Sequence, residues 1–229
     1  GSIRSDQGEH SEALYLTSSF VFKDAKEAAD RFGNLDEGNI YSRFTNPSVK
    51  MFEDRLSILE GAEQCVATST GMSAILACIM SLCKTGDHIV VSKSVFGTTI
   101  KLFDNILTKW GLQITYVSLT DLSEWKKSVK NNTKIFFVET PSNPLTEICD
   151  IAALADLAHT SKIHLVVDNC FSTPAHQLPI EFGADMIIHS ATKYLDGQGR
   201  CLGGAVLGKK NQMQHVANFL RSAGTSMSP

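Results

Sequence analysis

The sequence predicts an α/β fold with a seven-stranded, mostly parallel sheet and helices on both faces. Short runs rich in valine, isoleucine and leucine alternate with segments of helical length, which is typical of βαβ units. Of the 229 residues, 43% are hydrophobic, which is ample for a buried core. The expected strands span residues 64–69, 88–92, 113–118, 134–139, 164–168, 186–189 and 204–207.

The first 46 residues are predicted to form an arm that precedes the sheet. Its clearest element is a helix over 25–32, with Asp24 as the N-cap. Tyr41 and Arg43 stand two residues apart in a segment expected to be extended, so their side chains would point the same way. Such an arm either wraps a partner subunit or is a loosely packed extension, and both interpretations stay open.

Further helices are expected before and between the strands. Asn46 followed by Pro47 marks a helix start, and Gly61 marks its end. Its apolar face is expected to contain Met51, Leu56 and Leu59. The later helices are expected at 71–83, 97–110, 121–130, 150–160 and 209–223. No helical segment separates the last two strands, so the last strand should pair antiparallel or lie at an edge.

Composition excludes several classes of function. A net charge of −3 with both signs interspersed gives no basic surface for nucleic acid, and no apolar run is long enough to cross a bilayer. The N-terminus has no signal-peptide pattern. Six scattered cysteines and seven dispersed histidines show no metal-ligand spacing, so we expect reduced thiols, no metal and a cytoplasmic protein.

The stretch from 185 to 204 carries the strongest chemical signal. Lys193 follows the apolar strand 186–189, beside the hydroxyls of Ser190 and Thr192 and before a glycine-rich loop. A lysine that is partly desolvated at a strand end can form a Schiff base with an aldehyde cofactor, while hydroxyls and backbone amides hold a phosphate. Taken alone, a surface lysine after a strand is the commoner explanation.

Other strand ends carry complementary groups. Gly71 and Met72 open a helix directly after a strand, where free amides favour an anion. Asp168 ends an apolar strand, as a cap for the next turn or as the partner of a pyridinium nitrogen. Asn143 lies in a proline-bounded turn, and Phe96 could stack on a ring or simply belong to the core. The joint occurrence of these groups at successive strand ends indicates pyridoxal 5'-phosphate.

The same residues resemble a known family, the Cys/Met-metabolism pyridoxal phosphate enzymes of fold type I. The resemblance extends over nearly the whole chain. It is carried by Tyr41-Ser-Arg43, Gly71-Met72, Glu139-Thr-Pro-Ser-Asn-Pro144, Val167-Asp-Asn169, and Ser190-Ala-Thr-Lys193-Tyr with Gly203-Gly204.

The resemblance implies a role for each site residue. Lys193 would bind the cofactor covalently, and Asp168 would pair with the pyridinium nitrogen. Asn143 would contact the ring oxygen and the substrate. Tyr41 and Arg43 would reach the phosphate in the neighbouring subunit, with Tyr41 also near the substrate. The implied phosphate ligands within the chain are Gly71, Met72, Ser190 and Thr192.

Two positions depart from the family pattern. Thr70 stands where many relatives have serine, which keeps the hydroxyl. Phe96 stands where lyases and γ-synthases usually have a stacking tyrosine, so stacking is kept but a phenol that could move protons is lost. The second departure favours the sulfhydrylase branch of the family.

The resemblance therefore implies a transferase of methionine biosynthesis that acts on an activated homoserine ester. The expected reaction, as in the O-succinylhomoserine branch of the sulfhydrylases, is O-succinyl-L-homoserine plus sulfide to L-homocysteine plus succinate. Cystathionine γ-synthase and γ-lyase activities are the alternatives within the family. A non-catalytic, cofactor-binding assembly fragment is the alternative outside it, and a nucleotide-binding βαβ protein is remoter because no G-x-G-x-x-G turn is present.

The expected domain organisation has two parts. Residues 1–60 would form the arm and the first long helix, which contact a partner subunit and the cofactor. Residues 61–229 would form the large cofactor-binding domain. The resemblance also implies a homo-oligomer, expected to be a tetramer, and a smaller C-terminal domain, absent from this chain, with the arginine that grips the substrate carboxylate.

Overall fold

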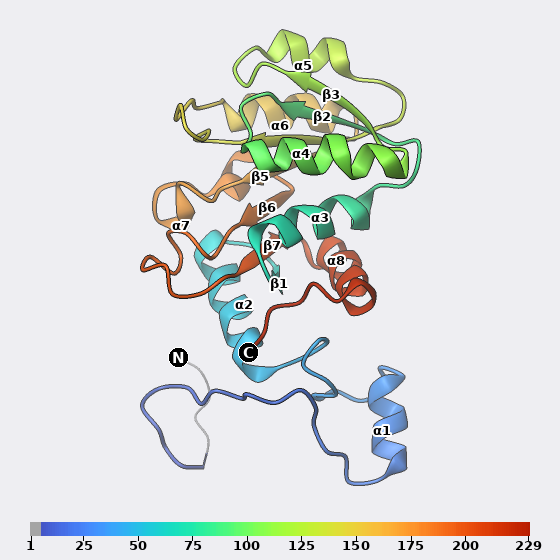
Figure 1. Ribbon diagram of the computed structural model, residues 1–229, viewed down its shortest axis with the longest axis vertical. Coiled ribbons are helices and arrows are strands. Elements are labelled where there is room, and N and C mark those ends of the chain that lie inside the picture. The colour runs from blue at the N-terminus through green and yellow to red at the C-terminus, as the bar shows by residue number, and fades with distance from the viewer. Residues whose placement is uncertain (1–5) are drawn as a thin grey trace.

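The computed structural model describes residues 6–229, and within them a single seven-stranded sheet forms the centre of the molecule (Figure 1). The strand order is β1-β7-β6-β5-β4-β2-β3. The strands are β1 (Gln64–Thr68), β2 (His88–Ser92), β3 (Gln113–Val117), β4 (Thr133–Glu139), β5 (His164–Asp168), β6 (Met186–His189) and β7 (Gly204–Gly208). All seven predicted strands are confirmed, and their ends differ from the prediction by at most one residue.

The last strand is antiparallel, as one of the two alternatives expected, but it does not lie at an edge. β7 is inserted between β1 and β6 and pairs antiparallel with both, whereas the other neighbours pair parallel. This leaves β1 parallel to β6, so the carboxyl ends of β1, β2, β4, β5 and β6 share one edge of the sheet. A side chain at position 204 would not fit there, because a Cβ on Gly204 would lie 2.1 Å from the Thr70 carbonyl oxygen.

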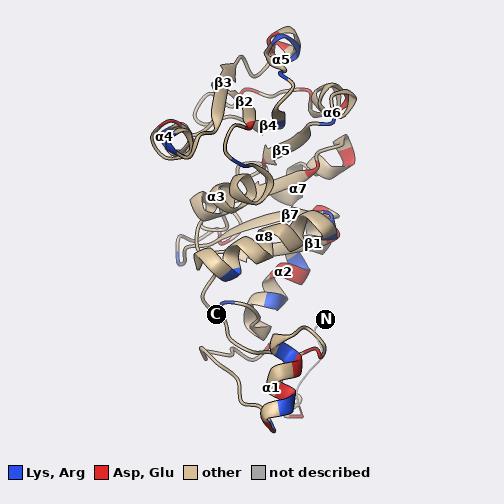
Figure 2. Ribbon diagram, turned by 90° about the vertical axis from the view of Figure 1, so that its right-hand side faces the viewer, with Lys and Arg blue, Asp and Glu red and all other residues tan. Residues whose placement is uncertain are grey.

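Helices cover both faces of the sheet (Figure 2). The first layer contains α3 (Gly71–Leu82), α4 (Gly97–Asn105) and α8 (Lys210–Ala223). The opposite layer contains α2 (Pro47–Glu60), α5 (Leu122–Ser128), α6 (Ile151–Thr160) and the short α7 (Thr173–His176) beside α2. The helix predicted over 97–110 instead ends at Asn105 and continues as a separate 3-10 turn, Leu107–Trp110.

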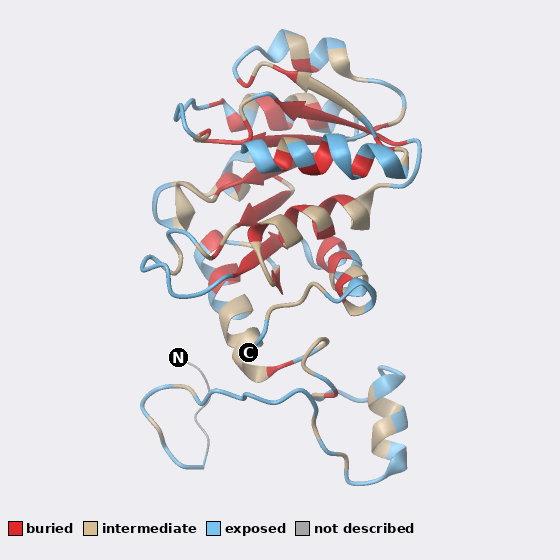
Figure 3. Cartoon of the chain, in the orientation of Figure 1, coloured by how far each residue is buried: buried red, intermediate tan, exposed pale blue. Residues whose placement is uncertain are grey.

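Alternation along the strands decides which side chains face which layer. Val166 and Ile188 pack in the cluster beneath α3, whereas Val167 packs beneath α6 and Ile187 beneath α2. Asp168 therefore follows Val166 onto the α3 face. His189 follows Ile187 onto the α2 face. Figure 3 shows the sheet as the buried centre of the chain.

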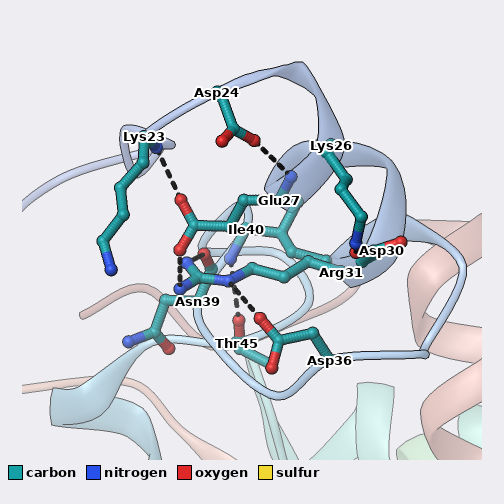
Figure 4. Close-up of polar contacts among 10 residues, drawn as sticks. All are labelled: Lys23, Asp24, Lys26, Glu27, Asp30, Arg31, Asp36, Asn39, Ile40 and Thr45. Atoms are coloured by element: carbon teal, nitrogen blue, oxygen red, sulfur yellow. Dashed lines mark hydrogen bonds and ion pairs between the residues drawn. The ribbon is translucent and has the colours of Figure 1, made fainter.

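The arm lies apart from the sheet and is largely exposed (Figure 3). Its helix α1 (Ala25–Phe32) is confirmed, and the Asp24 carboxylate accepts from the Glu27 amide at 2.8 Å. Arg31 organises the loop that follows (Figure 4): its guanidinium pairs with Glu27 at 2.7 Å and donates to the Asn39 carbonyl oxygen at 3.3 Å. The loop after α1 is thus held by polar contacts within the arm.

Two local predictions are wrong. The segment from Tyr41 to Arg43 is a turn and not an extended strand, because the amides of Phe44 and Thr45 both donate to the Tyr41 carbonyl oxygen, at 2.8 and 3.0 Å. Leu59 is 58% exposed, and α2 instead buries Glu60. Within residues 6–229, no helix is both long enough and apolar enough to cross a membrane.

Candidate functional site

A cavity of about 270 Å³ lies at the carboxyl edge of the sheet, on the side covered by α3. It brings together eight of the ten side chains or backbone groups selected from the sequence. These are Gly71, Met72, Phe96, Asn143, Asp168, Ser190, Thr192 and Lys193. Its wall also contains Thr70, Ile75, Thr99, Glu139, Cys170, Phe171 and Leu202.

Lys193 lines this cavity from the turn that follows β6. Its amide donates to the Ser190 carbonyl oxygen at 3.2 Å, and this turn carries the lysine beyond the buried strand. The residue is exposed in the single chain, so the expectation of partial desolvation is wrong here. The physical reason is its place at the start of the loop after β6, because burial ends at Ala191 and resumes only at Gly203.

Asp168 and Glu139 face the cavity as a pair of buried carboxyl groups. They are register partners on β5 and β4. Burial raises the pKa of Asp168 to about 6, opposed by a hydrogen bond of 3.1 Å from the Cys170 amide. Burial, followed by the charge of Asp168, raises the pKa of Glu139 to about 8. At neutral pH the pair therefore carries its negative charge on Asp168 and its proton on Glu139.

The N-terminus of α3 forms a second polar wall. The Thr70 hydroxyl accepts from the Ser73 amide at 3.0 Å, and the Ala74 amide donates to the Thr70 carbonyl oxygen at 3.0 Å. The amides of Gly71 and Met72 therefore have no acceptor within the helix. Both residues line the cavity, so these donors and the helix dipole suit an anion.

Replacing Gly71 by alanine should disrupt this wall. A Cβ at position 71 would lie 2.6 Å from the Ser190 Cβ, whereas a Cβ on Gly97, which opens α4, would meet nothing within 4 Å. We expect G71A to lower the free energy of unfolding by about 1–3 kcal/mol, as overpacking does, and G97A to leave it nearly unchanged. Denaturant unfolding of both variants measures this, and equal unfolding free energies would contradict the account.

The two hydroxyls near Lys193, those of Ser190 and Thr192, differ in their hydrogen bonds. Thr192 Oγ1 donates to the Gly203 carbonyl oxygen at 3.2 Å and accepts from the Gly203 amide at 3.0 Å. No hydrogen bond of the Ser190 hydroxyl is found among the described residues. Ser190 is thus available to a ligand, whereas Thr192 must leave Gly203 to donate to one.

Phe96 and Asn143 complete the cavity wall. Phe96 is 45% exposed, so its assignment as a core residue is excluded in the single chain. Its amide donates to Glu139 Oε2 at 2.6 Å, which fixes the ring-bearing residue at the start of α4. Asn143 and Phe171 also border a wider hollow, which Tyr194 lines as well.

The whole arrangement agrees with the family model for Cys/Met metabolism PLP-dependent enzymes, which matches residues 2–229. The chain belongs to this family. Its match covers both the arm and the sheet.

Individual family members give the degree of similarity. The chain is 58% identical over 229 residues to the O-succinylhomoserine sulfhydrylase of Pseudomonas aeruginosa, covering 100% of this chain and 57% of that protein. It is 40% identical over 218 residues to the L-methionine gamma-lyase of Treponema denticola, covering 94% of this chain and 54% of that protein. The chain thus spans a little over half the length of these relatives.

Solved structures of the family share the fold. A putative O-acetylhomoserine (thiol)-lyase from Campylobacter jejuni superposes with a TM-score of 0.93 at 28% identity, covering 98% of this chain and 64% of that one. That structure is described with N'-pyridoxyl-lysine-5'-monophosphate. A cystathionine gamma-lyase from Lactobacillus plantarum superposes with a TM-score of 0.89 at 32% identity, covering 97% and 56% of the two chains.

Tyr41 and Arg43 do not line the cavity of their own chain. The Arg43 guanidinium donates to the Arg221 carbonyl oxygen at the end of α8 and lies 4.7 Å from the Phe44 ring centroid. Tyr41 is 40% exposed. In one chain this pair therefore lies outside the cavity that the other eight residues line.

Sequence reasoning missed two notable residues of the cavity. Glu139 has the same signal as Asp168, a carboxyl group at the end of an apolar strand, and could have been selected on that ground. Thr99 lies within α4, is 1% exposed, and has no hydrogen-bond partner for Oγ1 among the described residues. No sequence pattern marks Thr99, because its position depends on how α4 packs. Within residues 6–229, no group of His, Cys, Asp and Glu could hold a metal ion.

The carboxyl pair should make stability depend on pH. Because the pKa of Glu139 rises from 4.5 to about 8 on folding, the folded chain binds more protons than the unfolded chain between these values. The free energy of unfolding should therefore fall as pH rises from 4.5 to 8. E139Q should remove about 1–3 kcal/mol of this fall, while its amide oxygen can still accept from Phe96.

Urea unfolding at several pH values measures this slope. E181Q, which changes an exposed carboxyl group, is the control. An unchanged slope in E139Q would show that Glu139 ionises normally in the folded chain.

Proposed function

We propose that this chain is the cofactor-binding part of a PLP-dependent enzyme that converts O-succinyl-L-homoserine and sulfide into L-homocysteine and succinate. The observation that carries the proposal is the position of Lys193 and Asp168 in one cavity, beside the free amides of α3. The 58% identity to an O-succinylhomoserine sulfhydrylase over the whole chain supports the choice of reaction.

The polar groups of the cavity suit pyridoxal phosphate. Thr99 Oγ1 is buried without a partner among the described residues, and the amides of Gly71 and Met72 have no helical acceptor. The backbone at Gly71 lies so close to Ser190 that no side chain fits between them. These donors suit a phosphate, and the buried carboxylate of Asp168 suits a protonated ring nitrogen.

We assign the residues accordingly. Lys193 is the point of covalent attachment, Asp168 the partner of the ring nitrogen, and Phe96 the residue that stacks on the ring. Asn143 binds the ring oxygen or the substrate carboxylate. The proposed phosphate ligands are the amides of Gly71 and Met72 and the hydroxyls of Ser190 and Thr192.

When bound, pyridoxal phosphate withdraws electrons from the substrate's α-carbon, which eases removal of the α- and β-protons and loss of the γ-substituent. Lys193 is the base that takes the α-proton and the acid that returns protons to the product. Phe96, Phe171 and Leu202 provide an apolar wall of the cavity. In the overall exchange the Cγ–O bond breaks, the Cγ–S bond forms, and succinate leaves with the electron pair.

The test is a three-way nucleophile assay on the complete protein, because the chain spans 57% of its sulfhydrylase relative. The enzyme receives O-succinyl-L-homoserine with sulfide, with cysteine or with neither. Homocysteine as the main product supports the proposal. Cystathionine, or 2-oxobutanoate formed without a nucleophile, would replace it by a γ-synthase or γ-lyase function. Full cofactor loading without any turnover would point to a non-catalytic fragment.

The γ-lyase is the second candidate, because the chain is 40% identical to an L-methionine gamma-lyase. Phe96 argues against it. A phenylalanine stacks on a ring but cannot transfer a proton, whereas the family pattern stated above places a tyrosine there in lyases. The succinyl group of the ester is part of the proposal, and so is sulfide, rather than cysteine, as the nucleophile.

We also propose that the protein is a homo-oligomer, with the arm reaching the cavity of a second copy. The arm exposes large apolar side chains, which a partner subunit would cover. They are Leu14 (72% exposed), Leu16 (76%), Val21 (95%) and Leu35 (82%). Six free thiols are compatible with a reducing, cytoplasmic setting, which we include in the proposal.

Replacing Arg43 by alanine should weaken cofactor retention if the arm of one subunit reaches the phosphate of another. Loss of one charge-assisted contact corresponds to about 10- to 100-fold weaker binding. Cofactor occupancy after dialysis, read from visible absorbance, measures this in the complete protein. K50A is the control, because Lys50 is a surface cation paired with Asp54. Full occupancy in R43A would argue against a cross-subunit contact.

A further inference from the structure

A buried polar cluster lies on the α2 face of the sheet, opposite the cavity. Glu60, Asn169 and His189 are each 0% exposed. His189 Nε2 lies 2.5 Å from Glu60 Oε1, and Asn169 Nδ2 donates to the same oxygen at 2.9 Å. The last residue of α2 is therefore joined to the ends of β5 and β6.

This cluster continues to the neighbouring strand ends. Asn169 Nδ2 also donates to the Gln177 carbonyl oxygen at 2.9 Å, and Gln177 Nε2 donates to the Thr140 carbonyl oxygen at 2.8 Å. Two buried atoms of this cluster, Glu60 Oε2 and His189 Nδ1, have no hydrogen-bond partner among the described residues. A buried pair with unsatisfied atoms is a poor stabilising device, because desolvation outweighs much of its attraction.

The position of the cluster beside Asp168 gives it another role. Asp168 pairs with Ile188 in the sheet, and His189 is the next residue. A positive charge on His189 would lower the pKa of Asp168, as the hydrogen bond from the Cys170 amide does, and would oppose the effect of burial. The cluster thus lies on one face of the sheet, next to a carboxyl group that lies on the other.

The surrounding titratable groups do not replace this charge. Asp168 faces Glu139 on β4, which carries the proton of the pair, and Cys170, whose pKa is raised to about 12 chiefly by burial. Lys193, which also borders the cavity, is exposed. On the α2 face, Cys65 of β1 lies near Glu60 and stays a neutral thiol, because burial raises its pKa.

A second buried histidine shows what a carboxyl partner changes. His88, at the start of β2, is also 0% exposed, but its ring nitrogens form hydrogen bonds with the hydroxyls of Thr133 and Thr115, each at 2.8 Å. Burial lowers the pKa of His88 to about 4, so this ring is neutral. His189 differs in having a carboxylate at hydrogen-bond distance.

We propose that Glu60 and His189 form a buried ion pair that keeps the Asp168 carboxylate ionised. They are positioning residues, since they act on the proposed cofactor only through Asp168. The inference rests on the proposed function for its consequence, but the charge of Asp168 can be measured without any cofactor.

The test follows two groups by NMR in the complete, cofactor-free protein. Histidine labelled with ¹⁵N reports whether the His189 ring is an imidazolium at pH 7, and aspartate labelled with ¹³C at the carboxyl carbon reports the titration midpoint of Asp168. H189N and D168N assign the two signals. In E60Q the amide oxygen can still accept from Asn169, so the variant removes charge and keeps the contact.

The expected result is an imidazolium at His189 in the wild type and an Asp168 midpoint that moves up by about one pH unit in both E60Q and H189N. H88N, the matched buried histidine, should leave the midpoint unchanged. If the cluster were purely structural, E60Q and H189N would lower the unfolding temperature without moving the Asp168 midpoint. A neutral His189 at pH 7, or an unmoved midpoint in both variants, overturns the proposal.

Cofactor titration then separates this inference from the proposed function. In E60Q, pyridoxal phosphate should bind about 2-fold more weakly at pH 7, because a rise of about one unit from a pKa of about 6 lowers the ionised fraction of Asp168 to about half. If neither wild type nor variant binds pyridoxal phosphate while the Asp168 midpoint moves, the proposed function fails and the ion pair stands. If wild type and E60Q bind equally and the midpoint does not move, the ion pair fails and the proposed function stands.

Discussion

Replacing Lys193 by alanine should abolish covalent cofactor attachment and lower turnover of the ester by at least about 10³-fold. Lys193 is the lysine that lines the cavity at the carboxyl edge of the sheet. Its amine is assigned both covalent attachment and proton transfer, and proton transfer alone accounts for about 10²- to 10⁴-fold in rate. Visible absorbance and steady-state kinetics of the complete protein measure the two losses separately.

The control for this variant is K93A. Lys93 follows β2 directly, so it also lies at the carboxyl edge of the sheet, but its side chain is 62% exposed and points to Glu124 at 3.8 Å. K93A should keep both absorbance and turnover. A K193A protein that retained the visible band and the wild-type rate would remove Lys193 from the mechanism.

Replacing Asp168 by asparagine should lower kcat by about 10²- to 10³-fold, as expected when a preorganised charge is lost at a reacting group. The asparagine oxygen can still accept from the Cys170 amide, which Asp168 Oδ1 does at 3.1 Å. The variant therefore removes the charge and keeps the local turn. Cofactor binding should weaken as well, because the ring nitrogen loses its ionic partner.

Kinetics and cofactor titration of D168N measure these effects, with E139Q as the comparison. Glu139 is the register partner of Asp168 but carries the proton of the pair at neutral pH. E139Q should therefore keep most of the turnover at pH 7. Equal loss of kcat in both variants would contradict the division of charge between the two carboxyl groups.

The strands could be predicted because each is a short apolar run between turn residues. Their spatial order could not. β7 follows β6 in sequence. In the sheet, however, it is inserted between β6 and β1, which lies about 140 residues earlier in the chain. Only long-range packing decides this insertion. The close approach of Gly204 to Thr70, which β1 and β7 require, is invisible in the local sequence.

Most of the site could be predicted because parallel strands bring their carboxyl ends to one edge. A chemically suitable residue at a strand end, such as Asp168 or Lys193, is therefore placed near the others by topology alone. Thr99 and the Glu60–His189 pair lacked this signal. His189 and Glu60 are 129 residues apart, and one ends a helix whose predicted apolar face did not include it.

The arm shows why a local sequence pattern predicts backbone conformation less well outside the sheet. Tyr41 and Arg43 were expected in an extended segment, but their backbone closes a turn on the Tyr41 carbonyl oxygen. Alternation indicates direction only where a strand ladder fixes the backbone. The contacts of Arg31 and Arg43 instead come from residues that no periodicity connects.

The most direct measurement is reduction of the complete protein with borohydride in the presence of pyridoxal phosphate, followed by peptide mapping. One stable pyridoxyl label on Lys193, absent from K193A, is the result expected from the cavity geometry. A label on another lysine, or a colourless protein that takes up no label, would contradict the central claim.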